Sequence, residues 1–504
     1  MTINGRQLQR NRLIDLTVTG LAFGGKGIAR PGDQPGDFVV FVAGAVPGDV
    51  VRARVTKNKK RYAEARAEEL LTPSPHRRPA RCPSFGGCGG CVWQNLDYGV
   101  QLRYKSDQVR ESLEHLGGLR DFELLPIVGM ADPWRYRNRA DFSVGTADEG
   151  AVVGFRPPGR WDTVLPLSEC HLLTPVIERV RGTVEAWLRE NGLPGWDPRA
   201  GAGFARHLLV RSAQSGAEVL ASLVTTPEDL PDASGLVERL RAAHPEVVGI
   251  VHAVNGGRAE ISSGLESETL WGRPFLLEKV AGITLKVSVD AFFQTNTLMA
   301  HALYGIVARE VGVGDTAPRV RAGGTVPAPR AGVADAAPRP GGSAPGGPVV
   351  WDLYSGVGSI GLSLAAQART VLAVEAMPDA VADARENARL NGISNVSFLE
   401  GDVARILREA VEGVRRLPEG LDRPDVIVVD PPRAGLSKKA VSRIGEAGAP
   451  RIVYVSCNPG TMAPNIAQLS EHGYRLQRVT PVDMFPHTPH VEAVALMSRS
   501  HVVA

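Results

Sequence analysis

The chain has 504 residues, of which 43% are hydrophobic and 22% charged, a composition that allows about three domains with ordinary cores. The N-terminal segment MTINGRQLQRNR is polar, and no apolar run approaches the ~20 residues of a membrane helix, which argues against a signal peptide and a membrane partner. We therefore expect a soluble cytoplasmic protein, with no obligate protein partner evident from the sequence.

Positive charge is concentrated near the N-terminus. Residues 1–81 carry fifteen Lys and Arg against seven Asp and Glu, a net charge of +8, and the whole chain carries +3, so the remainder carries −5. The densest basic run is KNKKRY at 57–62. Such a run fits either a solvated face or a surface that contacts a phosphate backbone.

Residues 8–71 are predicted to form a small OB-like β-barrel, because short apolar-rich runs alternate there with Gly/Pro turns. The expected strands lie at 13–22, 37–45, 49–57 and 61–71. A Pro-rich linker at 72–80 follows. Small basic barrels often bind oligonucleotides, but the fold alone does not establish that function.

Residues 80–285 are predicted to form a β-rich central domain. Its expected strands lie at 140–145, 151–156, 207–212 and 218–224, and 101–118 has helical spacing. Residues 312–348 are rich in Ala, Pro, Gly and Arg with few large apolar side chains. Such a segment cannot repay its ordering entropy, so we expect a disordered insertion.

The third predicted domain covers 286–504, and from Val349 its strands and helices alternate. Repeated units of this kind predict an α/β fold with a doubly wound parallel sheet. The expected strands lie at 349–354, 370–375, 395–402, 425–432, 451–456, 474–483 and 490–498, and a helix covers 379–391.

A glycine-rich loop follows the first strand of this sheet. The segment DLYSGVGSIG, 352–361, satisfies G-x-G-x-x-G, which permits a tight turn and close approach of a nucleotide. Glu375 ends the second strand, where a carboxylate accepts hydrogen bonds from ribose hydroxyls. NAD and S-adenosylmethionine both fit these residues, and Asp352 favours the latter because D-x-x-x-G-x-G is typical of class I methyltransferases. Asp402 would lie beside the adenine or merely cap a helix.

The segment DPPRAGL, 430–436, ends the fourth strand. A carboxylate before two prolines makes a rigid turn that faces a pocket. D/N-P-P-x is typical of methyltransferases that act on planar nitrogen-bearing groups, and dehydrogenases have no particular need for it.

Cys457 ends the next strand, in VSCNPGT, just before a predicted helix. A buried structural thiol is the ordinary fate of a lone cysteine, but here the positive end of the helix would lower the thiol pKa. A thiolate that adds to carbon 6 of uracil makes carbon 5 nucleophilic toward the methyl group of S-adenosylmethionine, and a base must then remove the carbon-5 proton. Glu492, whose pKa burial would raise, is the candidate base, with His487 and His490 as alternatives.

The other four cysteines are Cys82, Cys88, Cys91 and Cys170. An odd total of five, without a secretion signal, favours metal binding or catalysis over a disulfide framework.

The sequence resembles the RNA uracil-C5 methyltransferase family over nearly its whole length, through FFQTN, DLYSGVGSIGL, DPPRAGL, YVSCNPGT and MFPHTPHVE in this order. The resemblance implies a class I methyltransferase domain, a TRAM-type RNA-binding barrel, Cys457 as nucleophile and Glu492 as proton acceptor. It further places six residues around S-adenosylmethionine: Gln294, Tyr354, Ser359, Glu375, Asp402 and Asp430. Many members have Asn where this chain has Ser359, and the insertion at 312–348 departs from the family pattern.

The cluster CPSFGGCGGC with the later Cys170 resembles the iron–sulfur subgroup, which implies a [4Fe–4S] cluster on Cys82, Cys88, Cys91 and Cys170. Zinc accepts the same ligands. The subgroup implies 23S rRNA as the substrate, with tRNA as the alternative. Two rival classes are a tRNA methylthiotransferase-like enzyme, whose C-x-x-x-C-x-x-C spacing is absent, and a non-catalytic RNA-binding protein, against which Cys457 and Glu492 argue.

Overall fold

The computed structural model describes residues 8–31, 38–263, 265–312, 325–326 and 344–499. Residues 1–108 and 485–490 form one compact unit, and 109–484 and 491–504 form the other. Most of the predicted insertion at 312–348 lies outside the described residues. Within the described ranges, no helix is both long and apolar enough to cross a bilayer.

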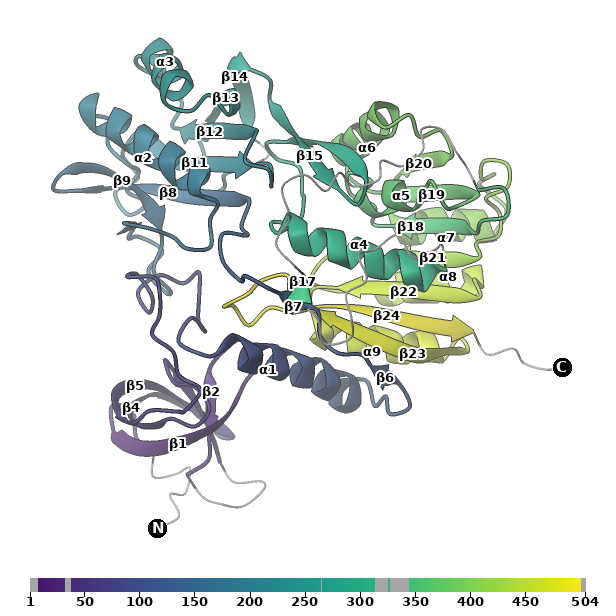
Figure 1. The fold of residues 1–504 in the computed structure, drawn as a ribbon, viewed down its shortest axis with the longest axis horizontal. Coiled ribbons are helices and arrows are strands. Elements are labelled where there is room, and N and C mark those ends of the chain that lie inside the picture. The colour runs from purple at the N-terminus through teal and green to yellow at the C-terminus, as the bar shows by residue number, and fades with distance from the viewer. Residues whose placement is uncertain (1–7, 32–37, 264, 313–324, 327–343, 500–504) are drawn as a thin grey trace. The chain divides into compact units, whose positions relative to one another are not determined.

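The first unit contains a closed five-stranded barrel, as the alternating pattern predicts (Figure 1). Every second side chain of its first strand points inward, so Ile14, Leu16 and Val18 pack in the barrel core. The strand order is β1-β2-β3-β5-β4, with β1 at Leu13–Leu21, β2 at Gly27–Ala29, β3 at Val39–Ala43, β4 at Val50–Asn58 and β5 at Tyr62–Thr72. The basic run forms the β4–β5 turn, where Lys59, Lys60 and Arg61 are exposed.

The second unit contains a seven-stranded sheet in the order β10-β9-β8-β11-β12-β13-β14, whose strands fall within the predicted central domain. These strands are β8 (Arg139–Ala147), β9 (Gly150–Phe155), β10 (Leu165–Pro166), β11 (Ala205–Ser212), β12 (Val219–Thr225), β13 (Val247–Val254) and β14 (Glu266–Gly272). Helices α2 (Pro175–Glu190) and α3 (Ala233–Ala243) pack on it through an apolar stripe that includes Trp187 and Leu236. A hairpin of β15 (Phe275–Val280) and β16 (Ile283–Ser288) follows.

The C-terminal region forms an eight-stranded sheet in the order β20-β19-β18-β21-β22-β24-β23-β6. Its strands are β18 (Val349–Leu353), β19 (Thr370–Glu375), β20 (Val396–Glu400), β21 (Val426–Val429), β22 (Arg451–Ser456), β23 (Tyr474–Val482), β24 (Glu492–Arg499) and the short β6 (Glu123–Leu124). Strands β18 to β22 are parallel, and β24 runs antiparallel to both of its neighbours. This is the predicted doubly wound sheet, extended by β6, which the sequence pattern does not predict.

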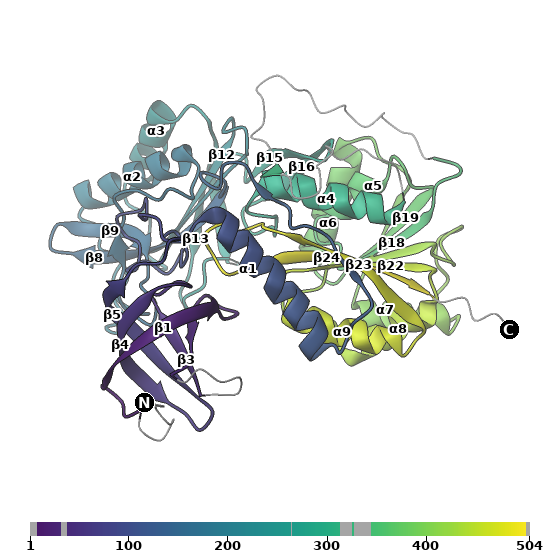
Figure 2. The same ribbon diagram turned by 60° about the horizontal axis from the view of Figure 1, so that its bottom comes forward.

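Helices cover both faces of this sheet. Figure 2 shows α4, α5 and α6 on one face and α7, α8 and α9 on the other. Their bounds are α4 (Thr297–Val311), α5 (Ser359–Leu364), α6 (Pro378–Leu390), α7 (Val403–Val411), α8 (Lys438–Ala447) and α9 (Pro459–Ser470). The remaining elements are α1 (Tyr98–Glu111), the π-helical turn η2 (Ser112–Leu116), and the paired β7 (Gly129–Met130) and β17 (Thr325–Val326). Because both faces are covered, the strands are continuously apolar, as in the fully buried β21.

Candidate active site

The carboxyl ends of four adjacent parallel strands bring predicted site residues to one edge of the sheet. The order β19-β18-β21-β22 aligns Leu353 with Val374 and Val429, and aligns Val429 with Tyr454. Tyr354, Glu375, Asp430 and Cys457 end or directly follow these strands. Ligands of open α/β sheets bind at this edge, so these four residues share the expected location of a site.

The antiparallel strand β24 brings Glu492 to the same edge. Ser456 of β22 pairs with Ala493 of β24. Because the two strands run in opposite directions, Cys457, one residue beyond Ser456, lies across from Glu492, one residue before Ala493. The chain reversal before β24 therefore places the predicted acid beside the predicted nucleophile.

The turn that carries Cys457 is fixed on both sides by hydrogen bonds. The Asn458 backbone N–H donates to Ser456 Oγ over 3.1 Å, and the Asn458 side chain accepts from Gly460 N over 3.1 Å, capping α9. The Asn458 amide and the Thr461 hydroxyl each donate to the carbonyl of Arg433 over 3.2 Å. The Cys457 turn is thus tied to the DPPR loop.

The Cys457 thiol is less acidic than the sequence predicts. Burial, together with the charges of Glu492 and Asp430, raises its pKa to about 11, whereas the charge of Arg433 lowers it. The prediction of a lowered pKa at the start of α9 is wrong, because desolvation and two carboxylates outweigh the helix dipole. In this state the thiol is protonated at neutral pH.

Glu492 and Asp430 are carboxyl groups with raised pKa values. Glu492 is 3% exposed, and burial together with the charge of Asp430 raises its pKa to about 8. Burial and the charge of Asp352 raise the pKa of Asp430 to about 7. Two acids that titrate near neutral pH beside a thiol are suited to exchange protons with a bound substrate.

The glycine loop is shaped around Asp352. Gly361 N–H donates to Asp352 Oδ2 over 2.8 Å, and a Cβ at Gly361 would lie 2.7 Å from the same oxygen. Gly358 has a φ of +81°, which favours glycine, and a Cβ there would meet Leu362 and Ala384 at 3.1 and 3.2 Å. The two glycines are therefore required by this turn.

The second oxygen of Asp352 is unusual. Asp352 is fully buried, and among the described residues Oδ1 has no hydrogen-bond donor. Burial and the charge of Glu375 raise the pKa of Asp352 to about 7. Buried polar atoms are normally paired, so Oδ1 is an acceptor for which a bound ligand can supply the donor.

Tyr354, Glu375 and Asp402 lie close together next to this loop. Burial raises the pKa of Tyr354 to about 12, and the charges of Asp402 and Glu375 contribute to the rise. The φ of Tyr354 is +65°, a strained conformation for a non-glycine residue. Glu375 accepts from Gly356 N over 2.9 Å, and Asp402 caps α7 by accepting from Arg405 N over 2.9 Å. Asp402 thus has the helix-capping role that the sequence left open.

Ser359 is the first residue of α5, and its Oγ accepts a hydrogen bond from the Tyr304 hydroxyl over 3.0 Å. Tyr304 is 3% exposed and comes from α4. The Ser359 hydroxyl therefore forms a hydrogen bond, and its partner is a tyrosine on α4, which precedes the sheet in the chain.

Gln294 lies in the segment before α4, which a polar network from the central domain fixes. The Asn138 amide donates to Gln294 O over 3.1 Å and to Thr297 Oγ1 over 2.9 Å. Thr297 Oγ1 donates in turn to Glu278, whose pKa burial raises to about 7. Arg211, 5% exposed, donates to Ala291 O over 2.7 Å.

Tyr304, Asn138 and Arg211 bond to Ser359 or to the segment that carries Gln294, and the sequence does not predict these contacts. Arg211 lies in an ordinary strand, and Tyr304 lies on a largely apolar helix, so neither stands out locally. Asn138 contacts Gln294 over 156 residues of chain. No short motif links them.

Of the four other cysteines, Cys82, Cys88 and Cys91 lie in the first unit and Cys170 lies in the second. In the part of the chain that the structure describes, no set of three or more His, Cys, Asp or Glu side chains is arranged to hold a metal ion. Thiolates are suitable ligands for iron or zinc, and two of these sulfur atoms accept hydrogen bonds. Cys88 Sγ accepts from Gly90 N over 3.4 Å, and Cys91 Sγ accepts from Gln94 Nε2 over 3.2 Å. The cluster on Cys82, Cys88, Cys91 and Cys170 therefore stays a prediction.

His487 is held by hydrogen bonds within the first unit. Its backbone N–H donates to Gln101 Oε1 over 3.0 Å, and its ring lies 3.2 Å from Gln101 Nε2. Its carbonyl accepts from Val92 N and Trp93 N over 3.0 and 3.1 Å. These contacts favour Glu492 over His487 as the base.

Two family models match the chain. Residues 347–500 match the model described as tRNA (uracil-5-)-methyltransferase, and residues 7–67 match the TRAM domain. The first match contains the glycine loop, Asp430, Cys457 and Glu492. The second contains the five-stranded barrel except for the end of β5.

Full-length relatives are also found. An uncharacterized RNA methyltransferase of Halalkalibacterium halodurans is 34% identical over 97% of this chain and 98% of its own length. Another, from Nitratidesulfovibrio vulgaris, is 36% identical over 97% of this chain and 96% of its own. The crystal structure of the Pyrococcus abyssi tRNA (uracil-54, C5)-methyltransferase with S-adenosyl-L-homocysteine has a TM-score of 0.71 and 26% identity, covering 96% of this chain and 99% of that one.

Proposed function

Because the chain belongs to the family of RNA uracil-C5 methyltransferases and is an S-adenosylmethionine-dependent enzyme of that family, we propose that it forms 5-methyluridine through a covalent bond between Cys457 and carbon 6 of uracil. The observation that carries this proposal is the strand register, which sets Cys457 across from Glu492 at the ligand-binding edge of the sheet. The raised pKa of Glu492 supports it, since a carboxylate with a pKa of about 8 is a stronger base than an exposed glutamate.

The reaction requires Cys457 to release its proton to bulk solvent and to add as a thiolate to carbon 6. The electron pair of the C5–C6 double bond then moves toward the ring carbonyl, which makes carbon 5 nucleophilic. Bound S-adenosylmethionine supplies an electrophilic methyl group. Once carbon 5 carries the methyl group, the Glu492 carboxylate accepts the carbon-5 proton, the double bond re-forms and the C6–S bond breaks. Cys457 leaves as a thiolate, and the product is 5-methyluridine.

A carboxylate with a pKa of about 8 suits this last step. An exposed glutamate, with an ordinary pKa near 4.5, is a weak base. Burial and the charge of Asp430 raise the pKa of Glu492 from 4.5 to about 8, so its carboxylate binds a proton more strongly. At neutral pH most Glu492 is protonated, so the fraction able to accept the carbon-5 proton should increase as the pH rises through about 8.

We assign the cofactor to the edge formed by the glycine loop. Gln294, Tyr354, Ser359, Glu375, Asp402 and Asp430 are the proposed contacts. Support comes from the placement of five of them around the ends of β18 to β21 and from the unpaired Asp352 Oδ1 beneath the loop. A cationic amino group is the kind of donor that this oxygen lacks.

The proposed substrate is 23S rRNA, with tRNA as the second candidate. The cysteine spacing supports rRNA through the family resemblance, whereas the solved Pyrococcus abyssi neighbour, a tRNA (uracil-54, C5)-methyltransferase, supports tRNA. The TRAM domain and its exposed basic turn at 57–62 suit either RNA. Mapping 5-methyluridine in both RNAs before and after deletion of the gene distinguishes them.

A [4Fe–4S] cluster on Cys82, Cys88, Cys91 and Cys170 stays a separate prediction, with zinc as its alternative. The N–H groups directed at two of the sulfur atoms support it, since such bonds accompany iron–sulfur ligands. Anaerobically purified protein should contain four irons and four sulfides. Stoichiometric zinc, or protein without metal, would contradict it.

The covalent step is tested with RNA that contains 5-fluorouridine at the target position. Fluorine cannot leave as a cation, so the enzyme should remain attached to the methylated base as an adduct that survives denaturation. Cys457→Ala should form none, while Glu412→Gln, which changes a half-exposed carboxylate outside the proposed site, should form it normally. Adduct formation by Cys457→Ala would exclude Cys457 as the nucleophile.

A further inference from the structure

The loop between β9 and β10 presents an exposed aromatic side chain that the proposed chemistry does not use. This loop, RPPGRWDTV at 156–164, contains Trp161, which is 57% exposed. Large aromatic rings are usually buried, so an indole left in water on a basic loop requires an explanation.

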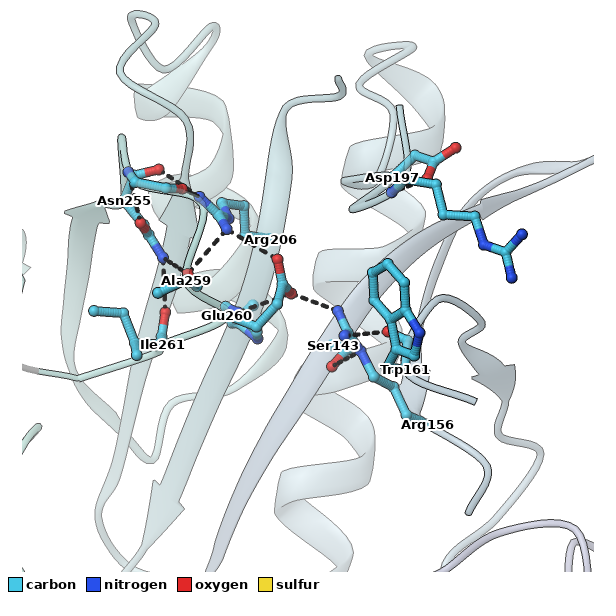
Figure 3. Close-up of polar contacts among 12 residues, drawn as sticks. Ser143, Arg156, Trp161, Asp197, Arg206, Asn255, Ala259, Glu260 and Ile261 are labelled. Carbon is cyan, nitrogen blue, oxygen red and sulfur yellow. Dashed lines mark hydrogen bonds and ion pairs between the residues drawn. The ribbon is translucent and has the colours of Figure 1, made fainter. Parts of the chain in front are cut away.

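Hydrogen bonds of Arg156 join this loop to β8 and to the segment after β13 (Figure 3). The Arg156 guanidinium donates to the Trp161 carbonyl, to Ser143 Oγ over 3.2 Å and to Glu260 over 2.5 Å. Because these bonds fix the backbone at Trp161, little conformational freedom is lost when a partner binds the ring.

The support continues to a buried arginine. Arg206, 1% exposed, donates to Glu260 over 2.9 Å and to the carbonyl groups of Asn255, Gly257 and Ala259 over 2.6 to 3.1 Å. Figure 3 shows this guanidinium at the centre of the turn that carries Glu260. The bonds extend from the core of the sheet to the exposed loop.

Cationic side chains surround the indole. The Arg199 guanidinium lies 6.0 Å from the centre of the Trp161 ring. The side chains of Arg199 and Arg160 are 68% and 65% exposed, and both pair with Asp162. Arg160 and Arg199 pair with Asp162, and Arg156 and Arg206 pair with Glu260, so four arginines face two carboxylates in these ion pairs. The neighbouring Asp197 accepts the backbone N–H of Arg199.

We infer that Trp161 is a stacking platform for an unpaired nucleobase of the substrate RNA, with Arg199 and Arg160 next to its phosphates. An exposed indole offers a π-face to any base, and adjacent guanidinium groups supply attraction to the backbone. This inference rests on the proposed function, since it takes the substrate to be RNA.

A protein partner fits this surface less well. Protein interfaces have an apolar centre, whereas Trp161 stands among charged side chains. The other exposed apolar side chain of this network, Ile261, lies apart from Trp161 in Figure 3, on the far side of Glu260. A single ring among arginines is the pattern of a single-stranded nucleic-acid site.

The test measures the dissociation constant of the full-length enzyme for a substrate RNA fragment at two salt concentrations. Trp161→Ala should weaken binding about fivefold or more at both, because one base stack contributes about 1–3 kcal/mol and is not ionic. Trp161→Phe should restore most of the affinity. Arg199→Gln should instead reduce, by about one, the magnitude of the slope of log association constant against log salt concentration.

Two controls separate this inference from the proposed function. Val414→Ala, at an exposed apolar side chain outside the central domain, should bind RNA like the wild type. At saturating RNA, Trp161→Ala should still form the 5-fluorouridine adduct at the wild-type rate, so a missing adduct in the wild type would overturn the chemistry alone. Binding by Trp161→Ala within twofold of the wild type would overturn the stacking role and leave a protein as the remaining partner.

Discussion

The rate of adduct formation between the enzyme and 5-fluorouridine RNA should rise steeply with pH. Addition to carbon 6 requires a thiolate, and the Cys457 thiol has a pKa of about 11. At pH 8 about one thiol in a thousand is then ionised, and each added pH unit raises that fraction about tenfold. Between pH 7 and pH 9 the single-turnover rate should therefore increase about a hundredfold.

Glu492→Gln sharpens this prediction. The carboxylate of Glu492 contributes less than burial to a pKa rise of about two units, from 9.0 to about 11. Removing its charge should therefore accelerate adduct formation by less than about tenfold. The acceleration should be larger at pH 9 than at pH 7, because Glu492, with a pKa of about 8, is ionised only at the higher pH.

The assay is rapid quenching of pre-bound enzyme and RNA, followed by denaturing gel electrophoresis. Glu412→Gln is the matched control, since it removes a carboxylate whose side chain is 48% exposed on another element. This control should follow the wild-type pH profile. A wild-type rate that stays constant from pH 7 to pH 9 would refute the reasoning, since it would mean that the thiol is already ionised in the complex.

Three further outcomes are expected. Glu492→Gln should transfer the methyl group to natural RNA but release product slowly, so that a protein–RNA conjugate accumulates on denaturing gels; unchanged turnover would remove Glu492 from its role. Asn138→Ala should raise the KM for S-adenosylmethionine about fivefold or more and leave RNA affinity constant, because it removes two hydrogen bonds to the Gln294 segment. The control is Asn191→Ala, which loses a side-chain hydrogen bond to Trp187 O. An equal rise in KM in both variants would contradict the positioning role of Asn138. Gly358→Ala should lower stability by about 1–2 kcal/mol, because its φ of +81° strains any side chain, and calorimetry without ligand would show no change if the turn were relaxed.

Much of the fold follows from local sequence signals. Apolar strands that alternate with helices specify the sheet, and the period of two in residues 13–21 specifies the barrel. The co-location of Cys457 and Asp430 also follows, because parallel strands end at one edge. Glu492 joins them only because β24 is antiparallel, a feature of chain topology.

Other features depend on contacts between distant residues and could not be predicted. Tyr304 reaches Ser359 from 55 residues away, and the contact between Asn138 and Gln294 arises only when the central domain folds. The prediction of a lowered pKa for Cys457 is also wrong. The segment VSCNPGT indicates a helix start, but it does not show the burial and the two carboxylates that raise the thiol pKa. The spacing of Cys82, Cys88 and Cys91 specifies neither their arrangement nor a metal.

The most direct test of the proposed mechanism is to locate the bond between enzyme and RNA. The 5-fluorouridine adduct of the wild-type enzyme should be digested with protease and nuclease, and its peptides analysed by mass spectrometry. The wild-type digest should contain a methylated fluorouridine nucleotide attached to the peptide that carries Cys457, and the Cys457→Ala digest should contain none. A nucleotide attached to any other residue, or 5-methyluridine produced by Cys457→Ala, would contradict the proposed mechanism.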